Sequence, residues 1–314
     1  MQKLIIKGKS ELVGNISISG SKNASLPILA ATILSNQATL KNIPFVQDTF
    51  TMIKLLRFIG LKVGISKSKG TVQVKNSNQN IKTLAPYNLV KTMRAGVLVL
   101  GPMLAKYKKT KISLPGGCAI GTRPVNLHLL ALKKLGAKIK IKSGYIIAEA
   151  KNGLKGSDIR FPKISVGATE NAILAAFYAN GKTTLNNCAI EPEVIDLINF
   201  LNKLGGKILI KGRKVFIYGT RKIKKKITHK IIFDRIELGT YLIAAALVGK
   251  KIHIKNIEPK LINKELNILE KMGVKLLIKK KSIIVLKSKN IKKINISTEP
   301  YPGFPTDLQA QLMV

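Results

Sequence analysis

The sequence is poor in three kinds of residue: it has no Trp, two Cys and only 15 acidic residues among 314. Two cysteines are too few for a disulfide framework, so we expect a reducing compartment. The best candidate for a membrane span, residues 95–105, is too short and contains a proline. The first residues lack the apolar core of a signal peptide. We therefore expect a cytoplasmic protein with no membrane partner.

Acidic residues are far outnumbered by basic ones, because 55 Lys and Arg give a formal net charge of +40. Such a charge can attract nucleic acid or small anionic substrates. All but seven of the basic residues are Lys, and they are spread along the whole chain. Aromatic residues make up 5% and no known nucleic-acid motif is present. We therefore expect no nucleic-acid partner and keep a basic nucleic-acid-binding protein as the weaker alternative.

The sequence repeats one pattern, in which an amphipathic helix ends at a glycine and alternating strands follow. The glycines are Gly60, Gly136, Gly205 and Gly273. Glycine directly after a helical pattern is the expected C-terminal stop. The alternation of Lys and Ile in residues 138–142 is typical of a half-buried strand. We therefore predict several copies of one α/β unit.

Each unit also has an apolar helix near its start. Residues 25–34, 170–178 and 238–248 have this pattern, and short strands follow at 38–40, 183–185 and 251–254. The unit is therefore βαβαββ. Helices so apolar must be covered on most sides, which favours helices packed together inside a shell of sheets. The glycine-rich fingerprint of a dinucleotide-binding doubly wound fold is missing.

A fifth unit is predicted to begin near the C-terminus. Residues 291–297 would be its strand, and a helix would start at residue 306. The sequence then stops inside that helix. We infer a fragment or a truncated gene product in which the last units are missing.

Residues 115–124, PGGCAIGTRP, contain three glycines, Cys118 and Arg123. Glycine allows the backbone to approach a ligand closely. A guanidinium five residues from a thiol favours the thiolate. The alternative is a surface turn in which Cys118 is an incidental small hydrophobe. Cys188 lies among apolar residues, and we interpret it as structural.

Polar residues occur at several predicted helix starts. Asp307 lies at one such junction, and Asp234 occupies the corresponding place in the fourth unit. The corresponding place in the first unit holds Lys22 with Asn23, and in the third unit it holds Lys163 with Ser165. Backbone amides at helix starts together with Lys bind anions well. The alternative interpretation is that Asp307 is only a carboxylate stabilised at a helix N-terminus, and that each Lys is a solvated surface residue.

Metal-binding spacing is missing from the sequence. No two of the three histidines have the spacing of a zinc site, and Cys118 and Cys188 are far apart. The sequence also contains no P-loop motif and no GxSxG motif. We therefore expect no metal site.

Seven stretches in order resemble the UDP-N-acetylglucosamine enolpyruvyl transferases. They are SGSKNASLPILAA, KTMRAG, LPGGCAIGTRPVNLHL, ISVGATENAILAA, EPEVIDLINFL, DRIELGTYLIAAA and YPGFPTDLQAQ. The resemblance runs from Met1 to Val314. It implies a two-domain, inside-out α/β barrel of βαβαββ units. Residues 22–230 would form a complete domain of three repeats, and residues 1–21 plus 231–314 a second domain, incomplete at the C-terminus.

The resemblance also implies a reaction. The enolpyruvyl group of phosphoenolpyruvate moves to the 3'-hydroxyl of UDP-N-acetylglucosamine and phosphate leaves, at the first committed step of peptidoglycan precursor synthesis. Asp307 matches the family's base and Cys118 its acid. No cofactor or metal is implied, and we expect a monomer. The substrate-binding residues matched to the family are Lys22, Asn23, Arg94, Arg123, Pro124, Val125, Asn126, Leu127, Lys163, Ile164, Ser165, Val166 and Asp307.

Two departures and two alternatives accompany the resemblance. Asn126 replaces the Asp of many relatives, and the family continues for about a hundred residues beyond Val314 with further arginines. An inactive truncated remnant is therefore one alternative. The related shikimate-pathway transferase is disfavoured, because PGGCAIGTRPV with its cysteine marks the UDP-sugar enzyme.

Overall fold

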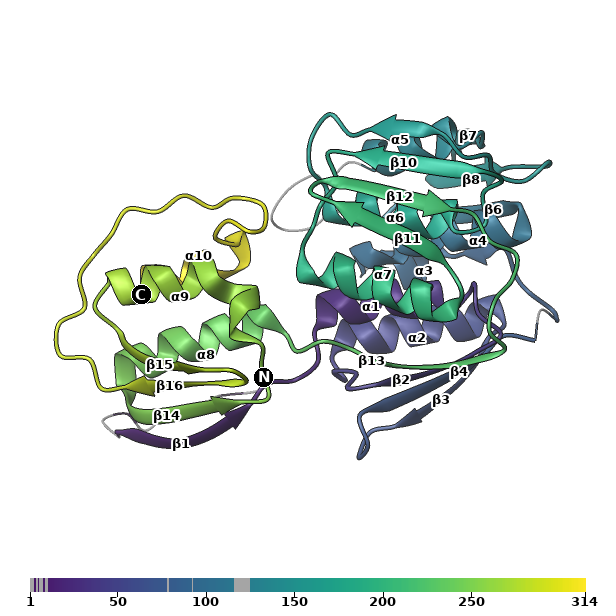
Figure 1. Cartoon of the computed structure of the whole chain (residues 1–314). Coiled ribbons are helices and arrows are strands. Elements are labelled where there is room, and N and C mark those ends of the chain that lie inside the picture. The colour runs from purple at the N-terminus through teal and green to yellow at the C-terminus, as the bar shows by residue number, and fades with distance from the viewer. Residues whose placement is uncertain are drawn as a thin grey trace. The chain divides into compact units, whose positions relative to one another are not determined.

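A computed structural model describes residues 3, 5, 8, 11–77, 79–91, 93–115 and 125–314. The contacts divide the chain into two units (Figure 1). The large unit is Gly20–Ile232, and the small unit combines Met1–Ser19 with Phe233–Val314. The chain therefore passes from one unit to the other twice, after Ser19 and after Ile232.

Among the described residues, the large unit contains three four-stranded sheets. In sheet order they are β13 (Lys226–Lys230), β2 (Gln37–Lys41), β4 (Thr71–Lys75) and β3 (Lys62–Ser66); β5 (Leu84–Ala85), β6 (Lys109–Ser113), β8 (Tyr145–Glu149) and β7 (Lys138–Lys142); and β9 (Asp158–Arg160), β10 (Lys182–Asn186), β12 (Lys214–Tyr218) and β11 (Lys207–Lys211).

All three sheets share one pairing pattern. The first two strands are parallel, as in β13 with β2, and two antiparallel pairings follow. The other two sheets repeat this order. A helix that crosses between parallel strands runs opposite to them, so its N-terminus lies at the carboxyl end of the first strand. In the second and third sheets, helices connect the two parallel strands, from β5 to β6 and from β9 to β10, so the first helix after β5 and the helix after β9 begin near the carboxyl ends of those strands.

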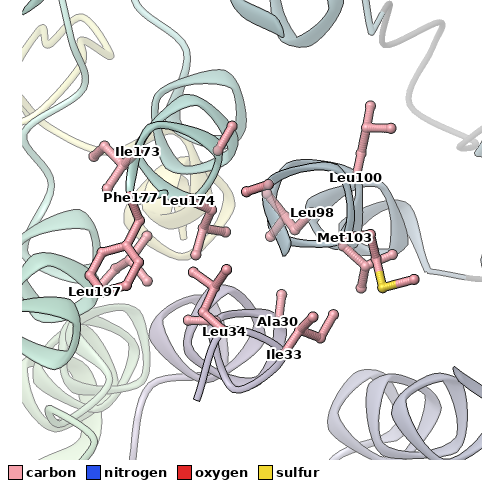
Figure 2. Packing of buried hydrophobic residues seen from close by; sticks show 14 of the residues in the cluster. Ala30, Ile33, Leu34, Leu98, Leu100, Met103, Ile173, Leu174, Phe177 and Leu197 are labelled. Atoms are coloured by element: carbon pink, nitrogen blue, oxygen red, sulfur yellow. The ribbon is translucent and has the colours of Figure 1, made fainter. Parts of the chain in front are cut away.

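The helices of the large unit pack together. They are α1 (Lys22–Ala31), α2 (Gln47–Ile59), α3 (Tyr87–Val90), η1 (Arg94–Val99), α4 (Leu100–Tyr107), α5 (Asn126–Lys134), α6 (Val166–Ala176) and α7 (Pro192–Leu204). Every residue from Ala24 to Ala31 in α1 is buried, as is every residue from Ala168 to Ala176 in α6. Figure 2 shows the side chains of Leu34, Leu98 and Leu174 meeting between helices. The predicted inside-out α/β arrangement is confirmed.

The four predicted helix stops are also confirmed. Gly60 and Gly205 follow α2 and α7 directly, with φ values of 115° and 124°. Gly136 and Gly273 have φ values of 92° and 91°. These conformations favour glycine because it has no Cβ.

The small unit has a sheet of the same kind. Its order is β1 (Leu12–Ser17), β14 (Gly249–Lys255), β16 (Ser282–Leu286) and β15 (Lys275–Lys279), with β1 parallel to β14. Its helices are α8 (Arg235–Val248), η2 (Pro259–Ile262), α9 (Asn263–Lys271), η3 (Thr306–Leu308) and α10 (Gln309–Met313). Nowhere in the described ranges is a helix both long and apolar enough to cross a bilayer.

The predicted strand at residues 291–297 is wrong. These residues form no strand and are mostly exposed; a single bridge, Thr298 to Phe304, follows them. A strand requires hydrogen-bonding partners along an edge, and none of the described strands pairs with this segment. Ile294 instead packs beside the small cluster of Ile268, Phe304 and Leu308.

Candidate functional site

The start of α1 presents two of the predicted substrate-binding residues, Lys22 and Asn23. Ser21 caps the helix, and its side chain accepts a hydrogen bond from the Ala24 amide at 3.2 Å. Lys22 Nζ lies 3.4 Å from Asp48 Oδ2 at the start of α2. Both side chains are partly exposed, so this ion pair contributes under about 1 kcal/mol. The ammonium therefore remains accessible to an anionic ligand.

The starts of α5 and α6 lie side by side. A Cβ at Gly167, the second residue of α6, would lie 3.2 Å from the His128 ring of α5. Glycine therefore allows the two helices to approach here. Val125, Asn126 and Leu127 lead into His128, and Ser165 and Val166 flank the start of α6. The structure thus brings two of the predicted UDP-sugar segments together.

Ser165 caps α6, and its hydroxyl accepts a hydrogen bond from the Ala168 amide at 3.4 Å. Ile164 is partly buried, whereas Lys163 and Val166 are exposed. The first amides of a helix have no intrahelical acceptor and favour negative charge. A lysine beside such a start provides both parts of an anion-binding site.

Arg94 is the exposed first residue of η1. Burial lowers the pKa of His128 to about 4, and the Arg94 charge contributes to the shift. Arg94 therefore lies within electrostatic reach of the α5 start. The predicted residues Arg94, Asn126 and Ser165 consequently belong to one region of the large unit.

Three buried carboxyl groups behind these helix starts were not predicted. Glu170 lies in α6, Glu191 directly precedes α7 and Glu193 is in the first turn of α7. Burial, together with the charges of Glu193 and Glu191, raises the pKa of Glu170 well above its usual value. A usable signal was the polar run Thr169, Glu170 and Asn171 inside an otherwise apolar helix.

Asp307 lies in the small unit as the exposed second residue of η3. The buried side chains of Phe304 and Leu308 hold this turn in place. A Cβ at Gly239 of α8 would lie 2.3 Å from Leu308 Cδ1, so a side chain at this position would displace Leu308. Asp234 caps α8 and accepts hydrogen bonds from the amides of Ile236 and Glu237.

Comparison with known proteins identifies the family. A family model described as EPSP synthase (3-phosphoshikimate 1-carboxyvinyltransferase) matches residues 6–314. The UDP-N-acetylglucosamine 1-carboxyvinyltransferase of Pelagibacter ubique (strain HTCC1062) is 57% identical over 100% of this chain and 75% of its own. The chain belongs to the UDP-N-acetylglucosamine 1-carboxyvinyltransferase family. A protein of the same name from Endomicrobium trichonymphae is 46% identical over 100% of this chain and 74% of its own.

Solved structures agree with this family assignment at the level of the fold. The enolpyruvyl transferase NikO from Streptomyces tendae has a TM-score of 0.84 at 19% identity, covering 97% of this chain and 72% of its own. EPSP synthase from Acinetobacter baumannii has a TM-score of 0.71 at 17% identity, covering 93% of this chain and 68% of its own. The UDP-N-acetylglucosamine 1-carboxyvinyltransferase family and these enzymes therefore share the enolpyruvyl transferase fold.

Three predicted site residues, Cys118, Arg123 and Pro124, lie outside the described residues. The described cysteine, Cys188, is buried and free. Burial raises the pKa of its thiol to about 12, so it is not a nucleophile near neutral pH. In the parts of the chain that the structure describes, no three His, Cys, Asp or Glu side chains form a group able to hold a metal ion.

Proposed function

We propose that the chain transfers the enolpyruvyl group of phosphoenolpyruvate to the 3'-hydroxyl of UDP-N-acetylglucosamine and releases phosphate. This is the first committed step of peptidoglycan precursor synthesis. The observation that carries the proposal is the 57% identity, over the whole chain, to a relative named for carboxyvinyl transfer to this nucleotide sugar.

The proposed chemistry is an addition followed by an elimination. Asp307 takes the proton from the sugar hydroxyl while the oxygen bonds to carbon 2 of phosphoenolpyruvate. Cys118 gives a proton to carbon 3, and it can also bond carbon 2 in a covalent adduct. Phosphate then leaves, carbon 3 loses a proton and the double bond is restored. Positioned general acids and bases typically contribute about 10²- to 10⁴-fold each.

Cations and helix starts would hold the two anionic substrates. Lys22 and Arg123 are assigned to the phosphate and carboxylate of phosphoenolpyruvate, and Asn23 to the substrate or the intermediate. Arg94 and the segments 123–127 and 163–166 are assigned to UDP-N-acetylglucosamine. The accessible Lys22 ammonium and the adjoining starts of α5 and α6 support these assignments, because anions bind at helix N-termini.

The proposal includes the following organisation. The chain acts as two domains, with residues 22–230 in one and residues 1–21 plus 231–314 in the other. The enzyme works as a cytoplasmic monomer without a cofactor or metal, since phosphoenolpyruvate is a co-substrate. Neither nucleic acid nor a membrane is a partner.

The test offers the 314-residue chain two acceptors. Incubation with phosphoenolpyruvate and UDP-N-acetylglucosamine, followed by mass spectrometry, should reveal an enolpyruvyl ether of the nucleotide sugar. Shikimate 3-phosphate, the acceptor in the name of the matched family model, should give no product. The Cys118→Ala variant is the matched control and should form no ether. Transfer to shikimate 3-phosphate alone would contradict the proposal.

A further inference from the structure

Asp196 and His229 form a buried pair in the large unit that the proposed chemistry does not use. Asp196 lies in α7 and His229 in β13, and their side chains are 4% and 2% exposed. His229 Nε2 lies 2.9 Å from Asp196 Oδ1. A carboxylate only accepts hydrogen bonds, so Nε2 carries the proton and donates it. The Phe200 ring meets the His229 ring edge-on, which restricts the imidazole.

The second oxygen of Asp196 binds the backbone. The Ile232 amide donates to Asp196 Oδ2 at 3.2 Å, and Ile232 is the last residue of the large unit. The Ile232 carbonyl in turn accepts from the Ser21 amide at 2.8 Å. Ser21 is the cap of α1, so the next residues along the chain are Lys22 and Asn23.

We propose that Asp196, held by His229, is a positioning residue for phosphoenolpyruvate binding. The hydrogen bonds run from Asp196 through the Ile232 peptide to Ser21, and they fix the start of α1. This inference rests on the proposed function, because it takes Lys22 as a ligand of phosphoenolpyruvate. Asp196 itself is not assigned a contact with substrate.

The physical reason is the cost of leaving a partly buried amide without a hydrogen-bond acceptor. Without the carboxylate, the Ile232 amide loses its acceptor, which favours movement of that peptide toward water. The Ser21 amide then loses the fixed position of its own acceptor. Lys22 is partly exposed, so its position depends on the backbone of α1 rather than on tight packing of its side chain.

Steady-state kinetics test the proposal with one conservative variant and one control. Asp196→Ala should raise the KM for phosphoenolpyruvate about tenfold, as expected for the loss of one hydrogen bond to a charged group. The KM for UDP-N-acetylglucosamine should change little. Asp196→Asn should stay near the wild-type value, because its oxygen can accept from Ile232 while its amide donates to the other tautomer of His229.

Asn202→Ala is the matched control. Asn202 lies on the same helix and also makes two backbone hydrogen bonds, to the amide and carbonyl of Ile208 at 2.9 and 3.0 Å. Its loss should lower stability without changing either KM. Equal rises of both KM values in Asp196→Ala, or the same kinetic pattern in Asn202→Ala, would overturn the proposal. If Asp196→Ala does not fold, Ser21→Ala tests whether the start of α1 controls phosphoenolpyruvate binding. It removes the side-chain cap of that helix start, leaves the Ser21 amide bonded to the Ile232 carbonyl, and should raise the same KM a few-fold.

Hydrogen exchange separates this inference from the proposed function. The amides of Ala24 and Ser25 in the first turn of α1 bond to Ser21. They should exchange faster in Asp196→Ala than in Asn202→Ala, even if the chain shows no transferase activity. Unchanged exchange at these amides would refute the positioning role, whereas absent wild-type activity would refute only the proposed function.

Discussion

Asn171 fixes the tautomer of His128. Its Nδ2 lies 3.0 Å from His128 Nδ1, while its Oδ1 accepts from the Gly101 amide at 2.7 Å and its Nδ2 also donates to the Val97 carbonyl. The amide orientation is therefore determined, and Nδ1 of His128 must accept. Protonating Nδ1 would place two donors against each other. His128 is thus a neutral ring at the start of α5.

This arrangement predicts a loss of stability in acid. Burial lowers the pKa of His128 to about 4 from an ordinary value of 6.5. As pH falls from 6.5 to 4, the unfolded chain takes up a proton that the folded chain refuses. His128 therefore lowers the unfolding free energy by up to about 1.4 kcal/mol per pH unit in this window. Urea unfolding of wild type and His128→Asn should show a steeper decline in the wild type. Parallel curves would contradict the neutral-ring assignment.

Glu170 should have the opposite effect, a loss of stability as pH rises. Burial and the neighbouring Glu193 and Glu191 raise its pKa, so the folded state keeps a proton that the unfolded state releases above pH 4.5. The contribution of protonated Glu170 to the unfolding free energy is fully present below pH 4.5 and declines as pH rises toward the raised pKa. Glu170→Gln should match wild type in acid and exceed its stability at pH 8, as measured by urea unfolding. A variant less stable than wild type at pH 8 would argue that an ionised Glu170 is bound by a cation.

The two thiols should react at different rates. Burial raises the pKa of Cys188 to about 12, so iodoacetamide should modify it only after unfolding. Cys118, which follows two glycines and precedes Arg123, should be alkylated first. Peptide mass mapping of wild type and Cys118→Ser near neutral pH measures this. Equal labelling of both residues would count against an activated Cys118.

Asp307 should be required for turnover and not for folding. Its carboxylate is exposed at η3, so Asp307→Asn should keep the wild-type unfolding free energy. Loss of the base should lower kcat by about 10²-fold or more. Glu299→Gln, an exposed acid in the segment before η3, is the control and should keep its activity. Full turnover by Asp307→Asn would remove the base assignment.

Local sequence patterns were sufficient to predict much of the fold. The glycines after α2, α5, α7 and α9 marked helix ends because positive φ values favour glycine. The largely apolar character of α1 and α6 predicted helices covered by sheets. The strand predicted at residues 291–297 does not form, because a strand needs a partner edge, and that edge is a tertiary property.

The candidate site was predictable only where a helix start carried a polar residue, as at Lys22, Ser165 and Asp307. The buried pairs His128–Asn171 and Asp196–His229 join residues 43 and 33 positions apart. No local pattern connects such residues, because the contacts arise from the packing of α5 on α6 and of α7 on β13. The polar run Thr169, Glu170 and Asn171 was a local sign of the first pair only.

Phosphate release from phosphoenolpyruvate tests the central claim most directly. The purified chain should release phosphate only when UDP-N-acetylglucosamine is also present, with one phosphate for each acceptor consumed. Phosphate release that does not depend on the nucleotide sugar, or consumption of the nucleotide sugar without phosphate release, would contradict the account.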